Sequence, residues 1–339
     1  MAISVLFWVI GSSLVVSGLR IGKEFDKEYN NQGRSVGIHD LGSRLERTRI
    51  VNGKDVLPNT YPFLGIIIKR SEPKCGGSLI APLVTITACH CLYMNDYKKM
   101  NKAKDVEFLV GAVDLDHARG LLRTARKLIA HSDCKFNAEI EGRRYEVVYD
   151  YGLIIFTEPF TKIFGYADVI ALPDFKGTSL IDKMIRDEVP CVLMGWGYTS
   201  ADAEGTSPTL KELSAKLRSQ DRCAQEVEKN LEAPYHATSV CVTALGINQS
   251  ACFGDSGGPL LCGKGEKQII GVASYIAGPC GKDKIPNVFA RLDMVSDWIN
   301  KIVAESPTIR PFVASGSVII SDRLVSFTLI AFILIKMCS

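Results

Sequence analysis

Residues 254–259 read Gly-Asp-Ser-Gly-Gly-Pro, and no other stretch of the chain tells more about its fold. The glycines on both sides of Ser256 let the backbone approach another group closely and direct N–H groups at it. A serine hydroxyl in such a loop becomes a nucleophile when a neighbouring base accepts its proton. The stretch therefore indicates a nucleophile loop that needs a base from elsewhere in the chain.

Two further segments carry the groups that such a loop requires. They read Thr87-Ala88-Cys89-His90-Cys91 and Tyr149-Asp150-Tyr151-Gly152-Leu153. An imidazole accepts a serine proton at neutral pH when a carboxylate fixes its tautomer and stabilises the imidazolium. We interpret His90, Asp150 and Ser256 as the candidate catalytic groups. Asp114 and Asp116 are alternative carboxylates, and a zinc-ligand role is the alternative for His90, which lies between two cysteines.

Short apolar stretches rich in Val, Ile, Leu and aromatic residues recur between the two ends of the chain. Each is bounded by Gly, Pro, Asn or Asp, which is typical of an antiparallel β protein. These stretches are 63–68, 79–87, 106–113, 145–156, 189–196, 268–276 and 288–292. Apolar residues at helical spacing over 294–303 predict a late helix with Asp293 as its N-cap, and a second short helix is expected over 221–231.

Composition restricts the class of protein but names no partner. The 339 residues are 47% hydrophobic and 23% charged, which excludes disorder over most of the length and a collagenous chain. The net charge of +3 is too small to drive binding to nucleic acid. Eleven cysteines indicate disulfides in a chain that enters the secretory pathway.

Both ends of the chain resemble processing signals. The apolar run 3–16 predicts a signal peptide over 1–18, with an uncleaved anchor as the alternative. The polar segment 19–49 has no cysteine and is interpreted as a removable propeptide. In the extension 306–339, small residues, a spacer and a hydrophobic tail follow in the order of a GPI-attachment signal. A retained membrane tether and an inert tail stay open, so we expect a secreted protein, attached to the outer cell surface if the signal is used.

The motifs taken together resemble the chymotrypsin/trypsin-like serine proteases over about 50–304. The chain order His, Asp, Ser is that of this family. The other matching motifs are Arg49-Ile50-Val51-Asn52-Gly53, Cys75-Gly76-Gly77-Ser78-Leu79-Ile80, Gly195-Trp196-Gly197, Ser274-Tyr275 and the helix that contains Trp298. The resemblance implies an all-β protease domain over 50–305, with two packed six-stranded antiparallel β-barrels and a C-terminal helix. It implies protein or peptide substrates and neither a cofactor nor a metal.

The resemblance also assigns a role to each candidate group. It implies that Ser256 attacks the scissile carbonyl and that His90 acts first as general base and then as general acid. It implies that Asp150 orients His90 and that Ser274 supports Asp150. The backbone N–H groups of Gly254 and Ser256 would form the oxyanion hole.

Activation follows from the junction between Arg49 and Ile50. The resemblance implies that cleavage after Arg49 frees the Ile50 ammonium, which then pairs with the carboxylate of Asp255. Because a buried charge is costly without its partner, the uncut chain is expected to be nearly inactive. The alternative interpretation of the arginines at this junction is a solvated basic stretch.

Specificity is inferred from positions that match the family's primary pocket. The residue six positions before the nucleophile is Ser250, so no carboxylate is expected at the pocket floor to pair with Lys or Arg. Ile276 and Asn287 match the pocket walls, and Ile276 should narrow the entrance; Ser274 and Tyr275 are further substrate-binding candidates. We expect a chymotrypsin- or elastase-like preference for uncharged apolar residues. Such an enzyme could not cut at its own Arg49 and would need a trypsin-like activating protease; protease inhibitors are further expected partners.

Cysteine pairing is implied only by the resemblance. The implied disulfides are Cys75 with Cys91, Cys191 with Cys262, Cys223 with Cys241, and Cys252 with Cys280. Cys89 replaces a residue that is usually a small alanine, and it either pairs with Cys134 or stays a buried free thiol. Cys338 is left over, and Asn248-Gln249-Ser250 matches an N-glycosylation acceptor. The alternative function is a catalytically inactive homologue that acts as a binding or regulatory protein.

Overall fold

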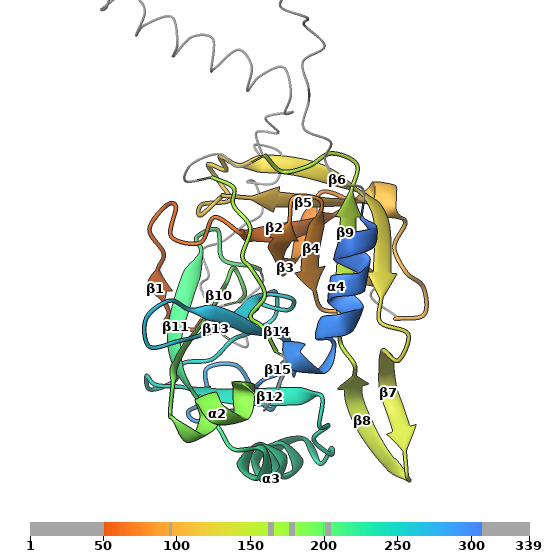
Figure 1. Ribbon diagram of the computed structural model, residues 1–339. Coiled ribbons are helices and arrows are strands. Elements are labelled where there is room, and N and C mark those ends of the chain that lie inside the picture. The colour runs from red at the N-terminus through yellow and green to blue at the C-terminus, as the bar shows by residue number, and fades with distance from the viewer. Residues whose placement is uncertain are drawn as a thin grey trace, which may run out of the picture. The chain divides into compact units, whose positions relative to one another are not determined.

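Buried strands rich in Val, Ile and Leu form the first of two barrels (Figure 1). The computed structural model describes residues 51–94, 97–161, 166–175, 180–198, 200 and 205–306. The first barrel has the strand order β2, β3, β4, β9, β6, β5, and β5 pairs back with β2 to close it. Its strands are β2 (Leu64–Lys69), β3 (Glu72–Ala81), β4 (Val84–Thr87), β5 (Val106–Val110), β6 (Leu121–Ala130) and β9 (Gly152–Phe156).

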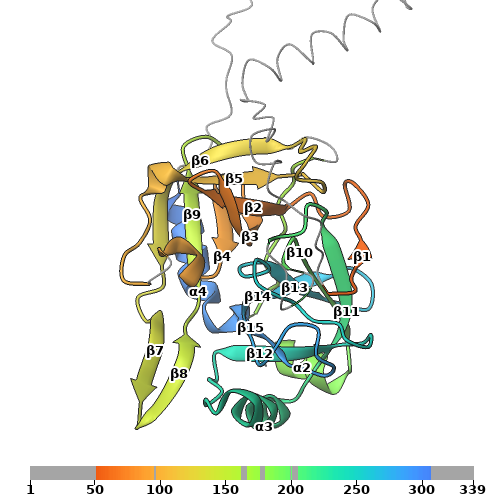
Figure 2. The same cartoon turned by 180° about the vertical axis from the view of Figure 1, so that it is seen from behind.

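The second barrel follows the first along the chain and is also antiparallel (Figure 2). Its order is β11, β10, β13, β14, β15, β12, and the pairing of β12 with β11 closes it. The short β1 (Lys54–Asp55) pairs with β11. The barrel strands are β10 (Pro190–Gly195), β11 (Lys211–Leu217), β12 (Ser239–Ala244), β13 (Pro259–Cys262), β14 (Gln268–Ile276) and β15 (Asn287–Arg291). The expected pair of six-stranded antiparallel barrels is therefore confirmed.

Helices are few and short in the described part of the chain. They are α2 (Leu180–Arg186), α3 (Gln220–Leu231) and α4 (Ser296–Glu305), with single 3-10 turns η3 (His90–Leu92), η4 (Ala103–Asp105) and η5 (Leu292–Met294). The expected helix over 221–231 is confirmed as α3. The predicted N-cap of the last helix is wrong, because α4 begins after Val295. Asp293 instead accepts hydrogen bonds from the guanidinium of Arg291 over 2.9 and 2.7 Å.

One apolar core cluster runs across the boundary between the barrels. It combines residues of the first barrel, such as Phe108 and Leu153, with Trp196 and Ile299 of the second half of the chain. Figures 1 and 2 show α4 beside β9 of the first barrel. Between β8 and β9, the fully buried Tyr151 places its hydroxyl 3.0 Å from the Thr238 carbonyl and 2.8 Å from the Arg291 carbonyl. Apolar packing and hydrogen bonds together hold the barrels against each other.

Five disulfides join cysteines of the described residues. Four are the pairs that the resemblance implies: Cys75–Cys91, Cys191–Cys262, Cys223–Cys241 and Cys252–Cys280. The fifth joins Cys89 to Cys134, so of the two alternatives for Cys89 the structure has the disulfide. Two of the five lie within the first half of the domain and three within the second.

The two ends lie outside the described residues, as do the expectations placed on them. These are the signal peptide, the propeptide, Arg49, Ile50, the hydrophobic tail and Cys338. Among the helices that the structure describes, none combines the length and the apolar character needed to cross a membrane.

The contact of Tyr151 with the second barrel can be tested by Tyr151→Phe. Loss of the hydroxyl leaves two buried carbonyls without this donor, so we expect the free energy of unfolding to fall by about 1 to 2 kcal/mol. Urea denaturation of the uncut chain measures it. Tyr166→Phe, at a partly exposed tyrosine, is the control and should have no effect. Equal stability of the two variants would contradict the proposed contribution.

Candidate active site

The loop that carries Ser256 is held against the first barrel. The N–H of Gly76 in β3 donates to the Ser256 carbonyl over 2.7 Å. Gly257 has φ +78°, and a Cβ there would collide with the Thr87 hydroxyl and the Gly76 carbonyl. Only glycine fits at this position, so the Gly-rich stretch lets the loop approach β3 and leaves the Ser256 side chain partly exposed.

His90 and Asp150 meet at the boundary between the barrels. His90 begins the η3 turn after β4, and Asp150 lies between β8 (Arg143–Val148) and β9. The His90 Nδ1 lies 2.8 Å from Oδ2 of Asp150, and the His90 backbone N–H donates to Oδ1 over 3.1 Å. The Ser274 hydroxyl, on β14, donates to Oδ2 over 2.6 Å. The predicted imidazole–carboxylate pair and the predicted contact of Ser274 are therefore both present as geometry.

The carboxylate of Asp150 is almost fully buried, at 3% exposed. Burial by itself would raise its pKa. Attraction to His90 and the hydrogen bonds from His90 and Ser274 outweigh burial and hold the pKa of Asp150 below its ordinary value. Asp150 is thus kept as an acceptor that fixes the orientation of the His90 ring.

The nucleophile and the base share one cleft. His90 and Ser256 both line a cavity of about 610 Å³. The structure has no hydrogen bond between the His90 ring and the Ser256 hydroxyl, a contact that in free enzymes often tightens only when substrate binds. Within the described residues, neither the N–H of Gly254 nor that of Ser256 donates to a protein acceptor. Ser256 lines the cavity and Gly254 does not, so the oxyanion role of these two amides stays a prediction.

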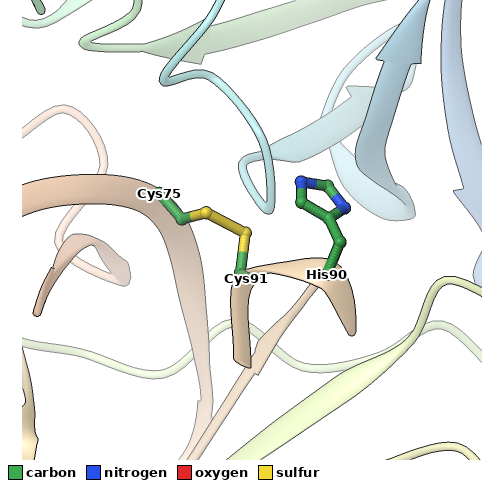
Figure 3. A group of neighbouring side chains, drawn as sticks. All are labelled: Cys75, His90 and Cys91. Carbon is green, nitrogen blue, oxygen red and sulfur yellow. A yellow bond between two sulfur atoms is a disulfide. The ribbon is translucent and has the colours of Figure 1, made fainter. Parts of the chain in front are cut away.

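The alternative assignments of this site do not fit the geometry. Asp114 accepts from the N–H of Asp116 and lies 3.1 Å from His117, so it serves a local turn. Figure 3 shows Cys91 next to His90, joined to Cys75 by a disulfide. Cys89 is also disulfide-bonded, so the cysteines flanking His90 offer no thiolate to a metal.

Asp255 is buried one residue before the nucleophile. It accepts from the N–H of Cys252 over 2.8 Å and from that of Gly197 over 2.7 Å. Burial raises the pKa of Asp255 to about 7, in spite of these two hydrogen bonds. Among the described residues, no cation pairs with it.

The start of the described chain lies beside the loop of Asp255. Val51 forms an antiparallel bridge with Ser250 and packs against the Cys252–Cys280 disulfide. The side-chain amide of Gln249 donates to the Asn52 carbonyl over 2.6 Å. These contacts fix the chain that directly follows the expected cleavage junction.

Of the residues expected in the primary pocket, most line the cleft and one does not. The lining includes Ser274, Tyr275, Ile276 and Asn287. Ser250 is fully buried, and its hydroxyl donates to the Ala251 carbonyl and accepts from the Gly281 N–H. It is absent from the lining. The buried Asn287 accepts from the Ala251 N–H over 2.7 Å, and its side-chain nitrogen donates to the Ile285 carbonyl over 3.3 Å, so its amide is bound to the backbone beside the cleft.

The cleft has one wall that no motif in the sequence predicted. The hairpin of β7 (Lys135–Ile140) and β8 stands between β6 and Asp150, and Phe136, Asn137, Glu146 and Val147 from it line the cavity. Its two turn residues, Glu141 and Gly142, both have positive φ, as a two-residue hairpin requires. This glycine turn between alternating residues is the signal that could have predicted the hairpin.

Comparison with known proteins adds an independent observation. The sequence model of the family described as Trypsin matches residues 50–299. Tonin of Rattus norvegicus is 29% identical over 266 residues, which are 77% of this chain and 92% of tonin. Neutrophil elastase of Mus musculus is 26% identical over 263 residues, or 78% and 86% of the two chains. The clotting factor G beta subunit of Tachypleus tridentatus is 27% identical over 278 residues, or 79% and 84%.

The raised pKa of Asp255 predicts how the stability of the uncut chain depends on pH. An acid whose pKa is about 7 when folded and 3.8 when unfolded favours folding at low pH, and this contribution is lost as the pH rises from about 4 to about 7. The free energy of unfolding should fall by about 4 kcal/mol over this pH range. Urea denaturation from pH 4 to 8 measures it, and Asp255→Asn should remove this part of the slope. The same slope in both proteins would contradict the prediction.

Proposed function

Because this chain belongs to the trypsin family of serine proteases, we propose that it is a secreted serine endopeptidase made as a zymogen. In this proposal, His90, Asp150 and Ser256 cleave peptide bonds after cutting at Arg49 has activated the chain. The observation that carries it is the 2.8 Å contact between the His90 ring and the buried Asp150 carboxylate, in the same cleft as Ser256. The alternative is an inactive homologue that binds proteins without cleaving them.

In the proposed chemistry, His90 acts first as base and then as acid in each half-reaction. The Ser256 oxygen attacks the substrate carbonyl while His90 Nε2 takes the hydroxyl proton, and Asp150 stabilises the imidazolium. The N–H groups of Gly254 and Ser256 donate to the oxyanion. His90 returns the proton to the leaving nitrogen as the C–N bond breaks, and water then hydrolyses the acyl-enzyme by the same steps.

In this proposal, cleavage after Arg49 supplies the cation that pairs with the buried carboxylate of Asp255. The new Ile50 ammonium would directly precede Val51, which already contacts Ser250 and Cys252. Pairing would remove the cost of burying the Asp255 carboxylate alone. The nucleophile loop would thus be stabilised when the chain is cut.

The lining of the cleft supports cleavage after uncharged apolar residues. Ile276 and Asn287 both line the cleft, and in this proposal the bulk of the Ile276 side chain leaves room only for small or medium substrate side chains. No carboxylate lies among the proposed pocket residues to pair with Lys or Arg. We therefore propose a preference for small or medium apolar residues, and a separate trypsin-like protease as activator.

The segments outside the described residues complete the proposal. A signal peptide over 1–18 would direct the chain to the secretory pathway, where disulfides form. The five disulfides support this compartment. The tail after 306 would serve as a GPI-attachment signal, which places the enzyme on the outer cell surface.

Activation and turnover can be tested together. After cleavage at Arg49, a fluorophosphonate probe should label the protein at Ser256 with loss of fluoride, and a protein substrate should be cut. Ser256→Ala should abolish labelling and lower kcat on the order of 10⁶-fold. Arg49→Gln should stay unlabelled after treatment with the activating protease. A correctly cut chain that is neither labelled nor active would favour the inactive homologue.

The pocket assignment predicts the effect of Ile276→Gly. Removal of the side chain should widen the cleft and raise kcat/KM for Phe relative to Val at the scissile bond about tenfold or more. Peptide libraries cut by the activated enzyme measure this ratio. Leu245→Gly, at an exposed residue outside the cleft lining, is the control. A wild-type enzyme that prefers Arg or Lys would overturn the assignment.

A further inference from the structure

A carboxylate on the β7–β8 hairpin lines the cleft, and the proposed mechanism does not use it. Glu146 in β8 borders the same cavity as His90 and Ser256. Figures 1 and 2 show the hairpin extending from the first barrel alongside the second, to the level of α3. A salt bridge of 2.7 Å between Arg143 of the hairpin and Glu228 of α3 joins the two. The far end of the wall that carries Glu146 therefore contacts α3.

The charge of Glu146 is not neutralised within the described residues. Neither an ion pair nor a hydrogen bond from a described residue reaches its carboxylate. Of the nearby arginines, Arg143 is paired with Glu228, and Arg144 lies opposite Glu139 in the strand register. The side chain of Glu146 is exposed on the cleft and is open to a cation from solution.

Aromatic rings line the same cavity as this carboxylate. Burial and, next to it, the charge of Glu146 raise the pKa of Tyr275, so the carboxylate acts on this phenol in the cleft. Tyr97 stacks on Phe136 with ring centroids 4.7 Å apart, and both line the same cavity. A carboxylate beside aromatic faces attracts an ammonium or guanidinium group through charge and through cation–π interactions.

We propose that Glu146, with the rings of Tyr97, Phe136 and Tyr275, binds a Lys or Arg side chain of the substrate. This inference rests on the proposed peptidase function and adds to it. Glu146 lies on the β7–β8 hairpin, whereas Ile276 lies on β14 and Asn287 on β15, so we place the basic side chain at a different substrate position from the one that enters the primary pocket. The enzyme thus requires an apolar residue at the cut and selects a basic residue elsewhere in the same substrate.

The test uses the cleaved, full-length enzyme and peptides with one apolar residue at the cut. Lys or Gln is placed in turn at each of the four positions before it and the two after it. At one position, Lys should raise kcat/KM about fivefold over Gln, the effect of one exposed charge pair. Raising NaCl from about 0.05 to 0.5 M should reduce this ratio, because salt screens exposed charges.

Variants of the hairpin distinguish the effect of the Glu146 charge from that of the hairpin's overall charge. Glu146→Gln should bring the Lys-to-Gln ratio close to one, and Glu146→Lys should favour a Glu peptide at that position. Glu139→Gln, on the same hairpin but outside the cavity lining, should keep the wild-type ratio. A ratio that Glu146→Gln leaves unchanged, or no preference for Lys at any position, would overturn the inference.

Failure of this inference is distinguishable from failure of the proposed function. Fluorophosphonate labelling and cleavage of an all-neutral peptide report the catalytic groups without Glu146. If both are normal and charge has no effect, only the basic subsite is refuted. If both are absent in the cut wild-type chain, the peptidase proposal is refuted and the subsite with it.

Discussion

The buried carboxylate of Asp150 is the constraint on which the geometry of the cleft depends. A charge in this position is tolerated only when hydrogen bonds replace the lost water. His90 supplies these bonds from the first barrel and Ser274 from the second, so the two barrels must dock for the charge to be satisfied. The next residue, Tyr151, directs its hydroxyl to carbonyls of the second half of the domain. The same contacts of Asp150 therefore join the two barrels and orient the imidazole of His90.

Much of the fold could be predicted from the sequence, because buried strands such as β2 and β14 are continuous apolar runs. Strands that face solvent on one side were harder to predict from the sequence. β6 reads LLRTARKLIA, with three basic residues among apolar ones, and β7 alternates polar with apolar side chains. The prediction that the strands close into two barrels came only from the resemblance, because the spacing of apolar residues does not define which strands pair. The N-cap was wrong at Asp293 because its carboxylate binds Arg291, a contact that the helical pattern does not contain.

The candidate site was predictable to the extent that it lies in local motifs. His90, Asp150 and Ser256 each stand in a short stretch whose chemistry is visible without coordinates. Side chains that reach the cleft through tertiary packing were not visible in this way. The hairpin contributes Phe136 and Glu146 from a segment that has no catalytic motif. Position in a motif also says little about access: Ser250 matches the pocket floor by spacing, yet it is fully buried in this structure.

Each half of the domain is cross-linked by its own disulfides, and no disulfide among the described residues joins the two halves. Cys75–Cys91 and Cys89–Cys134 brace the first half, and the remaining three bridges brace the second. None of these five disulfides connects the first half to the second. A thiol reductant would therefore loosen each half internally but would cut no bond across the seam. Apart from the connecting chain, packing and hydrogen bonds such as those of Tyr151 and Ser274 hold the halves together, whereas each half is also locked by its own disulfides.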